Sequence, residues 1–371
     1  MSDVIIVGGG VIGLSVAFEL ASRGIAVEVL DQGPIGQEAS WAGAGMLPPG
    51  NPILARTPEA RLRAASHAIW PNLTARLAEL TGIDNGFRRC GGLELCFHDD
   101  QPAFQSEVLH WREEGVAVEE LDTAALHHRE PNLSRRVQFA YRLHEMGQVR
   151  NPRHIKALMA GCAARGVKLR PGTPVVGFER SESRVTGVRT PEGIVAGDRI
   201  LVAGGAWSQP ILGELNLRLE VEPVRGQIVL LNQLPLPFTH VLNCGPRYLV
   251  PRPDGRILVG STEEHAGFVK QNTAGGINGL IEFAIQMCPA LAEARFERSW
   301  AGLRPHGRDE LPYLGRVPGF DNVFVACGHF RAGLQLSPIT GVVMADLIEG
   351  KPPRLPLEPY GCERGLSDGQ A

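Results

Sequence analysis

The sequence lacks the features that mark several specialised classes of protein. Across its 371 residues, no apolar run approaches the roughly 20 residues that a membrane-spanning helix needs. No block of basic residues stands out and the net charge is -3, which argues against nucleic acid as the main partner. No internal repeat or low-complexity tract is present. We therefore expect an ordinary soluble globular protein, with neither nucleic acid nor a membrane as partner.

Cysteine is scarce and follows no metal-binding or disulfide pattern. The seven cysteines include no CxxC pair, and the closest two, Cys90 and Cys96, have five residues between them. An odd number without a framework predicts free thiols in a reducing compartment and no metal site. A glycine motif begins at residue 8, which leaves no room for a signal peptide ahead of it. These features predict a cytoplasmic protein, and the length is sufficient for two domains.

The stretch from Val4 to Asp31 predicts a strand, a tight turn, a helix, a second strand and an acid. Gly8 is expected to make the turn, Gly10 to let a pyrophosphate approach the backbone, and Gly13 to let helix and strand pack closely. The free N–H groups and positive dipole of the helix start would hold phosphates. Asp31 follows Gly13 by 18 residues, where a carboxylate can accept from ribose hydroxyls. The stretch therefore favours a dinucleotide-binding site, and the alternative is a strand–helix–strand unit with only a structural role. The motif does not distinguish FAD from NAD.

Three other segments also favour a parallel sheet that binds a large ligand at its edge. Residues 33–50 form a loop of small residues that can lie against a large ligand. A buried strand is expected at 199–203, running into a run of small residues, and another at 322–327, followed by a glycine loop and a helix at 339–349. Strands ending in small residues are typical of a parallel sheet whose carboxyl edge binds a ligand. Residues 218–301 are richer in strand and hairpin signals.

Four motifs together resemble a known family. VIIVGGGVIGLSVAFEL near the start, ILVAGGAWS in the middle, then WAGLRP and ACGHFRAGLQLSP are similar to the FAD-dependent D-amino-acid oxidase superfamily, and within it to the glycine oxidases of thiamin thiazole synthesis. The resemblance covers essentially the whole chain. It implies an α/β fold in which a Rossmann-like FAD-binding domain interleaves with an α+β substrate domain built on an antiparallel sheet. The implied FAD-binding domain comprises residues 1–84, 148–217 and 302–371, and the substrate domain comprises 85–147 and 218–301.

The resemblance also implies site residues. Arg304 and Tyr248 would bind a substrate carboxylate, and Arg331 would line the substrate pocket. Relatives often carry Glu where Asp31 stands, but the shorter acid can still accept from ribose. His329 is interpreted as a residue near the flavin and not as a base. The implied FAD-binding residues are Gly8, Gly10, Val11, Ile12, Gly13, Asp31, Gln32, Ala39, Ser40, Ala44, Gly45, Met46, Val175, His329, Phe330, Arg331, Ala332, Gly333, Leu334 and Gln335.

An α-amino acid substrate gives these residues a common purpose. A planar guanidinium binds a carboxylate through two parallel bonds, which a lysine cannot imitate. Oxidation of a neutral amine by hydride transfer to FAD needs orientation and a dry pocket, so no general base is expected. The implied products are hydrogen peroxide, from O2, and an imine that water converts to oxoacid and ammonia. Glycine, sarcosine and small D-amino acids all fit. Family members often form homotetramers, although nothing in this sequence requires one, and the resemblance also implies transfer of glycine imine to a thiazole synthase.

Less specific interpretations remain for each residue. Arg304 could be a surface charge, Tyr248 could pack in the core, and Arg331 could pair with a structural carboxylate. Sarcosine oxidase-like relatives attach flavin through a cysteine just after the region that matches Arg304. Residues 305–312 contain no cysteine, which predicts noncovalent FAD. The sequence is also compatible with an amine dehydrogenase that reduces a quinone or partner, and with a non-enzymatic dinucleotide-binding module.

Overall fold

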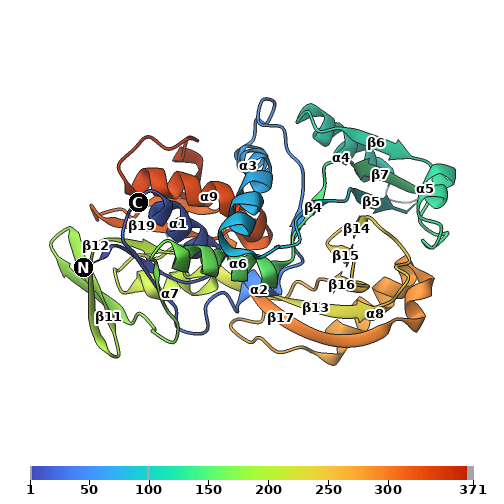
Figure 1. The fold of residues 1–371 in the computed structure, drawn as a ribbon. Coiled ribbons are helices and arrows are strands. Elements are labelled where there is room, and N and C mark those ends of the chain that lie inside the picture. Colours follow the sequence, from blue (N-terminus) through green and yellow to red (C-terminus); the bar gives the residue numbers. More distant parts are fainter. Residues whose placement is uncertain (1, 98–100, 366–371) are drawn as a thin grey trace.

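The computed structural model describes residues 2–97 and 101–365. Within that part of the chain, two eight-stranded sheets and one three-stranded sheet organise the fold. We call the two large sheets sheet I and sheet II. Figure 1 shows sheet I with helices α1 and α9 on the left and sheet II on the right. The mixed α/β architecture expected from the sequence is confirmed.

Sheet I has a parallel centre flanked by antiparallel strands. Its order is β10-β11-β12-β1-β2-β9, and β19 joins β12 on one side and β18 on the other. The pairs β1–β2, β1–β12, β2–β9 and β12–β19 are parallel. The strands are β1 (Ser2–Val7), β2 (Val27–Leu30), β9 (Lys168–Arg170), β10 (Gly177–Ser181), β11 (Arg184–Thr190), β12 (Gly193–Val202), β18 (Tyr313–Arg316) and β19 (Val323–Cys327).

Strand β1 is apolar on both faces because both faces of sheet I are covered. Val4 and Ile6 pack into the core beneath the helices, whereas Ile5 and Val7 pack into a second core on the opposite face. The helical layer comprises α1 (Val11–Ser22), α3 (Pro58–Thr81), α6 (Asn151–Ala164) and α9 (Gly333–Ile348), and α7 (Ser208–Gly213) contributes to the other core.

The turn between β1 and α1 shows why its glycines are needed. Gly8 has a φ of +112°, and a Cβ there would lie 2.3 Å from the carbonyl oxygen of Ala203. A Cβ on Gly13 would lie 2.0 Å from the Gly8 carbonyl oxygen. Both contacts are with backbone atoms that cannot move aside, so these positions exclude any side chain. The roles expected for Gly8 and Gly13 in the turn and the helix–strand contact are confirmed.

Helix α9 begins earlier than the sequence predicts. The expected start at Ile339 is wrong, because the helix spans Gly333–Ile348 and contains Pro338, with a 3-10 turn at Phe330–Ala332 before it. Proline cannot donate to the carbonyl four residues earlier, that of Leu334. The hydroxyl of Ser337 donates to this carbonyl instead, at 2.9 Å. The side chain therefore replaces the missing backbone bond.

Sheet II is antiparallel except for the parallel pair β14–β5. Helix α8 (Ala274–Met287) covers one face, and α4 (Gln101–Glu113) covers part of the other. Strand β17 spans residue 301, so the domain boundary expected there falls inside a strand. In order the strands are β17 (Arg295–Gly307), β13 (Val221–Asn232), β16 (Arg256–Gly260), β15 (Arg247–Pro251), β14 (Val241–Cys244), β5 (Gly92–Cys96), β7 (Phe139–Leu143) and β6 (Val118–Leu121).

Short elements connect the large sheets. The three-stranded sheet joins β3 (Met46–Leu47), β8 (Gly147–Gln148) and β4 (Arg88–Arg89), and two short helices are α2 (Ala39–Ala42) and α5 (Thr123–Arg129). At the start of helix α3 the Thr57 hydroxyl accepts from the N–H of Ala60, and Gly82 ends the helix in the left-handed conformation. Among the helices of the described residues, none has the length and apolar character needed to cross a membrane.

Candidate active site

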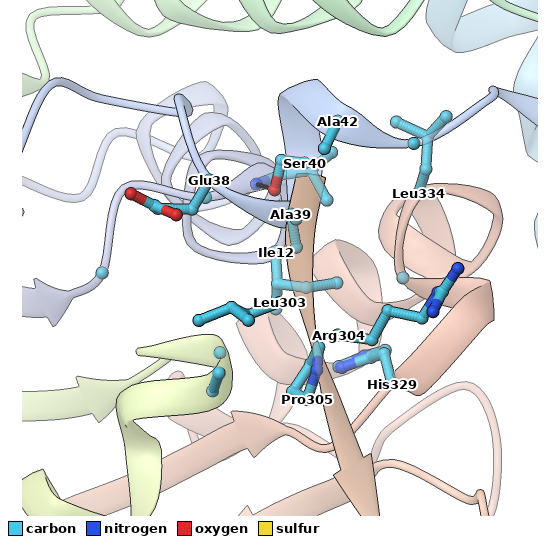
Figure 2. A pocket seen from close by; sticks show the side chains of 18 of the residues that line it. Ile12, Glu38, Ala39, Ser40, Ala42, Leu303, Arg304, Pro305, His329 and Leu334 are labelled. Atoms are coloured by element: carbon cyan, nitrogen blue, oxygen red, sulfur yellow. Dashed lines mark hydrogen bonds between the residues drawn. The ribbon is translucent and has the colours of Figure 1, made fainter. Parts of the chain in front are cut away.

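A cavity of about 630 Å³ is lined by residues of both large sheets. One end is formed by the β1–α1 turn, the end of β2 and the loop around α2, and the other by strands of sheet II. Figure 2 shows Ile12, Ala39 and Ser40 together, with Arg304 and His329 below them. The cavity therefore joins the two groups of residues that the sequence assigns to cofactor and to substrate.

The first turn of α1 points into the cavity without a charge to neutralise it. Gly10 is the N-cap and supplies no side-chain hydrogen bond, and the first turn contains no acidic residue. The N–H of Val11 donates to Ser40 Oγ at 2.9 Å, and Gly10, Val11 and Ile12 all line the cavity. A helix N-terminus with free N–H groups and an uncompensated dipole suits a diphosphate.

Asp31 lies beside this helix start, at the end of β2. Its Oδ2 accepts from the N–H of Gly9 at 2.8 Å and its Oδ1 from that of Gly33 at 2.9 Å. Burial raises the pKa of the Asp31 carboxyl, and the two N–H donors act against that increase. Each oxygen retains a lone pair, so the carboxylate can still accept from ribose hydroxyls. Gln32 and Val175 line the adjacent wall.

The loop of small residues after β2 forms another wall. Ala39, Ser40, Ala44, Gly45 and Met46 all line the cavity. Gly45 has a φ of +74°, and a Cβ there would lie 2.0 Å from the carbonyl oxygen of Val149. The small residues thus let this backbone lie close to the cavity, as the sequence predicts for a ligand-contacting loop.

Two buried polar atoms in the wall have no partner within the protein. Asn151 donates from its Nδ2 to the carbonyl oxygen of Ser40 at 2.8 Å, but its Oδ1 has no hydrogen bond. The Nε2 of His329 lies 3.1 Å from Thr340 Oγ1, and its Nδ1 has no hydrogen bond. Both residues line the cavity. Since buried polar groups are normally paired, a large polar ligand would complete this wall, and FAD fits the residues present.

The segment before α9 contributes the remaining cofactor-side residues. His329, Phe330, Arg331, Gly333, Leu334 and Gln335 line the cavity, but Ala332 does not. Ala332 packs against the core beneath the helices, and Gly13 likewise lies outside the lining, in the helix–strand contact described above. Burial lowers the pKa of His329 to about 3, so its imidazole is neutral at physiological pH.

Arg304 is a cation without a carboxylate partner in the described part of the chain. Its Nη1 donates to the carbonyl oxygen of Thr262 at 3.1 Å and its Nη2 to Ser261 Oγ at 2.6 Å. Burial lowers the pKa of the guanidinium, and the Tyr248 phenol and Glu263 act in the opposite direction. A guanidinium has five N–H donors, so donors remain for a ligand in the cavity. The arrangement would suit a carboxylate ligand.

Tyr248 lies on β15, which β16 and β13 separate from β17, and its phenol is close enough to the Arg304 guanidinium to interact with its charge. A Cβ on Gly260 would lie 2.4 Å from the phenol oxygen, so the ring rests over that glycine. Burial raises the pKa of the phenol, while Ser261 and the charge of Arg304 act against the increase. The phenol thus remains protonated at physiological pH and can donate a hydrogen bond.

Arg331 is placed differently from Arg304. Its guanidinium pairs with the carboxylate of Glu263, and the two side chains are 49% and 38% exposed. Arg331 lines the cavity, but its ion pair is the structural contact that the sequence also allows. An exposed pair of this kind contributes little to stability and can exchange partners readily.

Two glycines that the sequence analysis did not single out shape the substrate end. A Cβ on Gly226 would lie 2.3 Å from Arg304 Nη2, and Gly260 makes room for Tyr248 in the same way. Both lie inside or at the end of strands, where a glycine often marks a close approach of another group. The neighbouring Glu94 and Asn243, which also line the cavity, were missed as well.

Comparison with known proteins assigns the family. The model of a family described as FAD dependent oxidoreductase matches residues 3–347. The chain belongs to this family. A glycine oxidase of Pseudomonas putida is 38% identical over 366 residues, which span 98% of this chain and 99% of the relative. The crystal structure of glycine oxidase from Geobacillus kaustophilus superposes with a TM-score of 0.94 at 33% identity, covering 99% of both chains.

Another relative of this FAD-dependent oxidoreductase is longer. The bifunctional protein ThiO/ThiG of Trichormus variabilis is 34% identical over 359 residues, which cover 93% of this chain and 52% of that protein. FAD is the cofactor of the family, and when bound it supplies a two-electron acceptor. In this FAD-dependent oxidoreductase, the α1 N-terminus, Asp31 and the small-residue loop would hold it.

Proposed function

We propose that this enzyme is an oxidase of glycine and similar small amines, including sarcosine and small D-amino acids. The observation that carries the proposal is the unpaired guanidinium of Arg304, which faces the same cavity as the dinucleotide cradle. A cation in this position would bind an anionic group of a ligand. Because Arg304 and the cofactor-side residues line the same cavity, that ligand would lie beside the cofactor. The similarity to glycine oxidases supports glycine as a substrate.

The chain supplies binding and orientation to this reaction. Arg304 would hold the substrate carboxylate through two parallel N–H bonds, and Tyr248 would donate its phenol to the same group. Arg331 would close the pocket wall beside them. No residue is assigned as a general base in this proposal, because hydride transfer from a neutral amine needs only orientation and a dry pocket. The substrate would therefore react as the neutral amine, and the imine product would be hydrolysed to oxoacid and ammonia.

Noncovalent binding of FAD is part of the proposal. Cys327 lines the cavity, but burial raises the pKa of its thiol to about 12, so the nucleophilic thiolate does not form at neutral pH. Protein precipitated with acid should release its yellow colour into the supernatant. Colour retained in the pellet would show a covalent bond and contradict this part of the proposal.

Peroxide formation tests the proposed activity. The purified yellow protein would be mixed with glycine, sarcosine, D-alanine and D-proline, with L-alanine and L-proline as controls. Peroxide in air and bleaching of the flavin under nitrogen are expected with glycine. Bleaching without peroxide would indicate a dehydrogenase that uses another electron acceptor. No bleaching with any substrate would overturn the proposed substrate class.

We also propose that the glycine imine is transferred to a thiazole synthase. The support is the resemblance to glycine oxidases of thiamin synthesis, together with the ThiO/ThiG relative, of which this chain covers only about half. Loss of the gene should create a growth requirement for the thiazole of thiamin. Normal growth of the deletion strain without thiazole would contradict this role.

A further inference from the structure

One row of residues crosses sheet II and faces the cavity. Successive register pairs join β17, β13, β16, β15, β14 and β5. Residues in register on neighbouring strands project from the same face of a sheet. The row therefore continues beyond the substrate carboxylate receptor to two residues that the proposed reaction does not use. In order its members are Trp300, Ile228, Gly260, Tyr248, Asn243 and Glu94.

Glu94 is a carboxyl group without a cation. Its Oε1 accepts from Nδ2 of Asn243, and both residues line the cavity. No Lys, Arg or His among the described residues forms an ion pair with Glu94. Burial raises the pKa of the carboxyl to about 7, and the negative charge of Glu107 adds to the increase. A carboxylate placed in this way needs a cation or a proton.

The surroundings of Glu94 on its other side are also acidic. Tyr141 is its register partner on β7, and the Tyr141 hydroxyl donates to Glu107 Oε2 at 2.8 Å. The side chain of Glu107 comes from α4, which covers this part of the sheet. Asn243, Tyr141 and Glu107 thus face Glu94 from β14, β7 and α4, and none of them carries positive charge. A cationic group of a ligand could therefore pair with ionised Glu94 in this corner.

The distance along the row separates this corner from the carboxylate receptor. Neighbouring strands lie about 4.8 Å apart, so the Cα atoms of Gly260 and Glu94, three strands apart, are separated by roughly 14 Å. The Tyr248 phenol rests over Gly260, on the side away from Glu94. A glycine bound at Arg304 would be too short to reach Glu94. A longer amino acid held by the same carboxylate contact could reach it with its side chain.

We propose that Glu94 and Asn243 form a second substrate subsite, which binds the cationic end of an α-amino acid side chain of the length of ornithine or lysine. This inference rests on the proposed function, because Arg304 must hold the carboxylate while the side chain reaches the acidic corner. Glycine uses only the first contact. Diamino acids would use both and would satisfy the unpaired guanidinium and the unpaired carboxylate of the cavity together.

The test compares two substrates of equal size. D-Ornithine and D-norleucine have the same number of side-chain heavy atoms, but only ornithine ends in a cation. The ratio of their kcat/KM values would be measured for the wild type and for Glu94→Gln, with flavin absorbance and glycine kinetics checking folding. The control is Glu120→Gln, an exposed residue of the same sheet that pairs with Arg112. Because both substrates carry the same α-amine and carboxylate, any effect of a substitution on the binding or oxidation of these groups cancels in the ratio of the two kcat/KM values.

The wild type should prefer ornithine, and Glu94→Gln should lower the ratio by at least about tenfold. The wild-type preference should also increase between pH 6 and 8.5 as Glu94 loses its proton. The ratio should not change in the Glu120→Gln control. A ratio unaffected by Glu94→Gln, or failure of both long substrates while glycine reacts, would overturn the subsite alone. Failure of glycine in the wild type would overturn the proposed function instead.

Discussion

Removing the guanidinium of Arg304 tests the central assignment directly. In Arg304→Ala the substrate carboxylate would lose two charge-assisted hydrogen bonds, each of about 1.5–3 kcal/mol. Tyr248 would retain one bond to the carboxylate, and water would enter the vacated space and compensate in part. We therefore expect a loss of about 3–4 kcal/mol in transition-state binding of glycine. This loss corresponds to a decrease in kcat/KM of roughly 10²–10³-fold.

The control for this variant is a substrate without a carboxylate. Methylamine has the amine of glycine but cannot contact Arg304, so its slow oxidation should change by less than about threefold in Arg304→Ala. Arg304→Lys should restore the charge but not the paired geometry, and should recover only part of the glycine activity. Flavin content verifies that the cofactor end of the cavity remains intact. Unchanged saturation by glycine, or an equal loss with methylamine, would refute the carboxylate contact.

Three further predictions concern other parts of the cavity. Gly226→Ala would place a Cβ 2.3 Å from Arg304 Nη2 and should raise the KM for glycine at least about tenfold without loss of FAD, whereas Gly213→Ala, in open space, should have no effect on either quantity. Asp31→Asn should raise the Kd for FAD about 10–100-fold, measured by fluorescence titration of the apoprotein, because it removes a charged acceptor; an unchanged Kd would contradict the ribose contact. Glu94 has a folded-state pKa of about 7, above its ordinary value of 4.5, so its contribution to stability is largest below pH 4.5 and is lost as the pH rises to about 7. Denaturant unfolding should show Glu94→Gln gaining about 2–3 kcal/mol relative to the wild type across that window, and a constant difference would refute the raised pKa.

The parts of the fold that the sequence predicts well are governed by short-range signals. The strand–turn–helix at Gly8 to Gly13 is predicted by the spacing of its glycines together with the two apolar runs, the helical pattern and Asp31 around them. Thr57 and Gly82 mark the ends of α3 by the capping rules. The error at the start of α9 has a local cause too, since Pro338 normally argues against a helix and only the Ser337 hydroxyl makes it tolerable.

The substrate end was harder to predict because it depends on long-range pairing. Glu94 and Asn243 are 149 positions apart, and only the pairing of β5 with β14 brings their side chains together. The role of Gly226 depends on the position of the Arg304 side chain on an adjacent strand. A sequence pattern shows neither relation, so resemblance supplied Arg304 and Tyr248, while the surroundings of both required the structure.

Strand β17 has a consequence for how molecules reach the cavity. It pairs with β13 from Arg295 to Gly307, and its residues 302–305 line the cavity. A hinge motion that opened the cavity would bend the paired strands β13 and β17 and break their backbone hydrogen bonds. Substrate and product must therefore pass at the rim of the cavity. Glu38, which lines the cavity, forms an exposed ion pair with Lys270 at 2.7 Å, and a pair of this kind separates at little cost. We therefore expect entry and exit to follow loop motions of nanoseconds to microseconds and not slower domain closure.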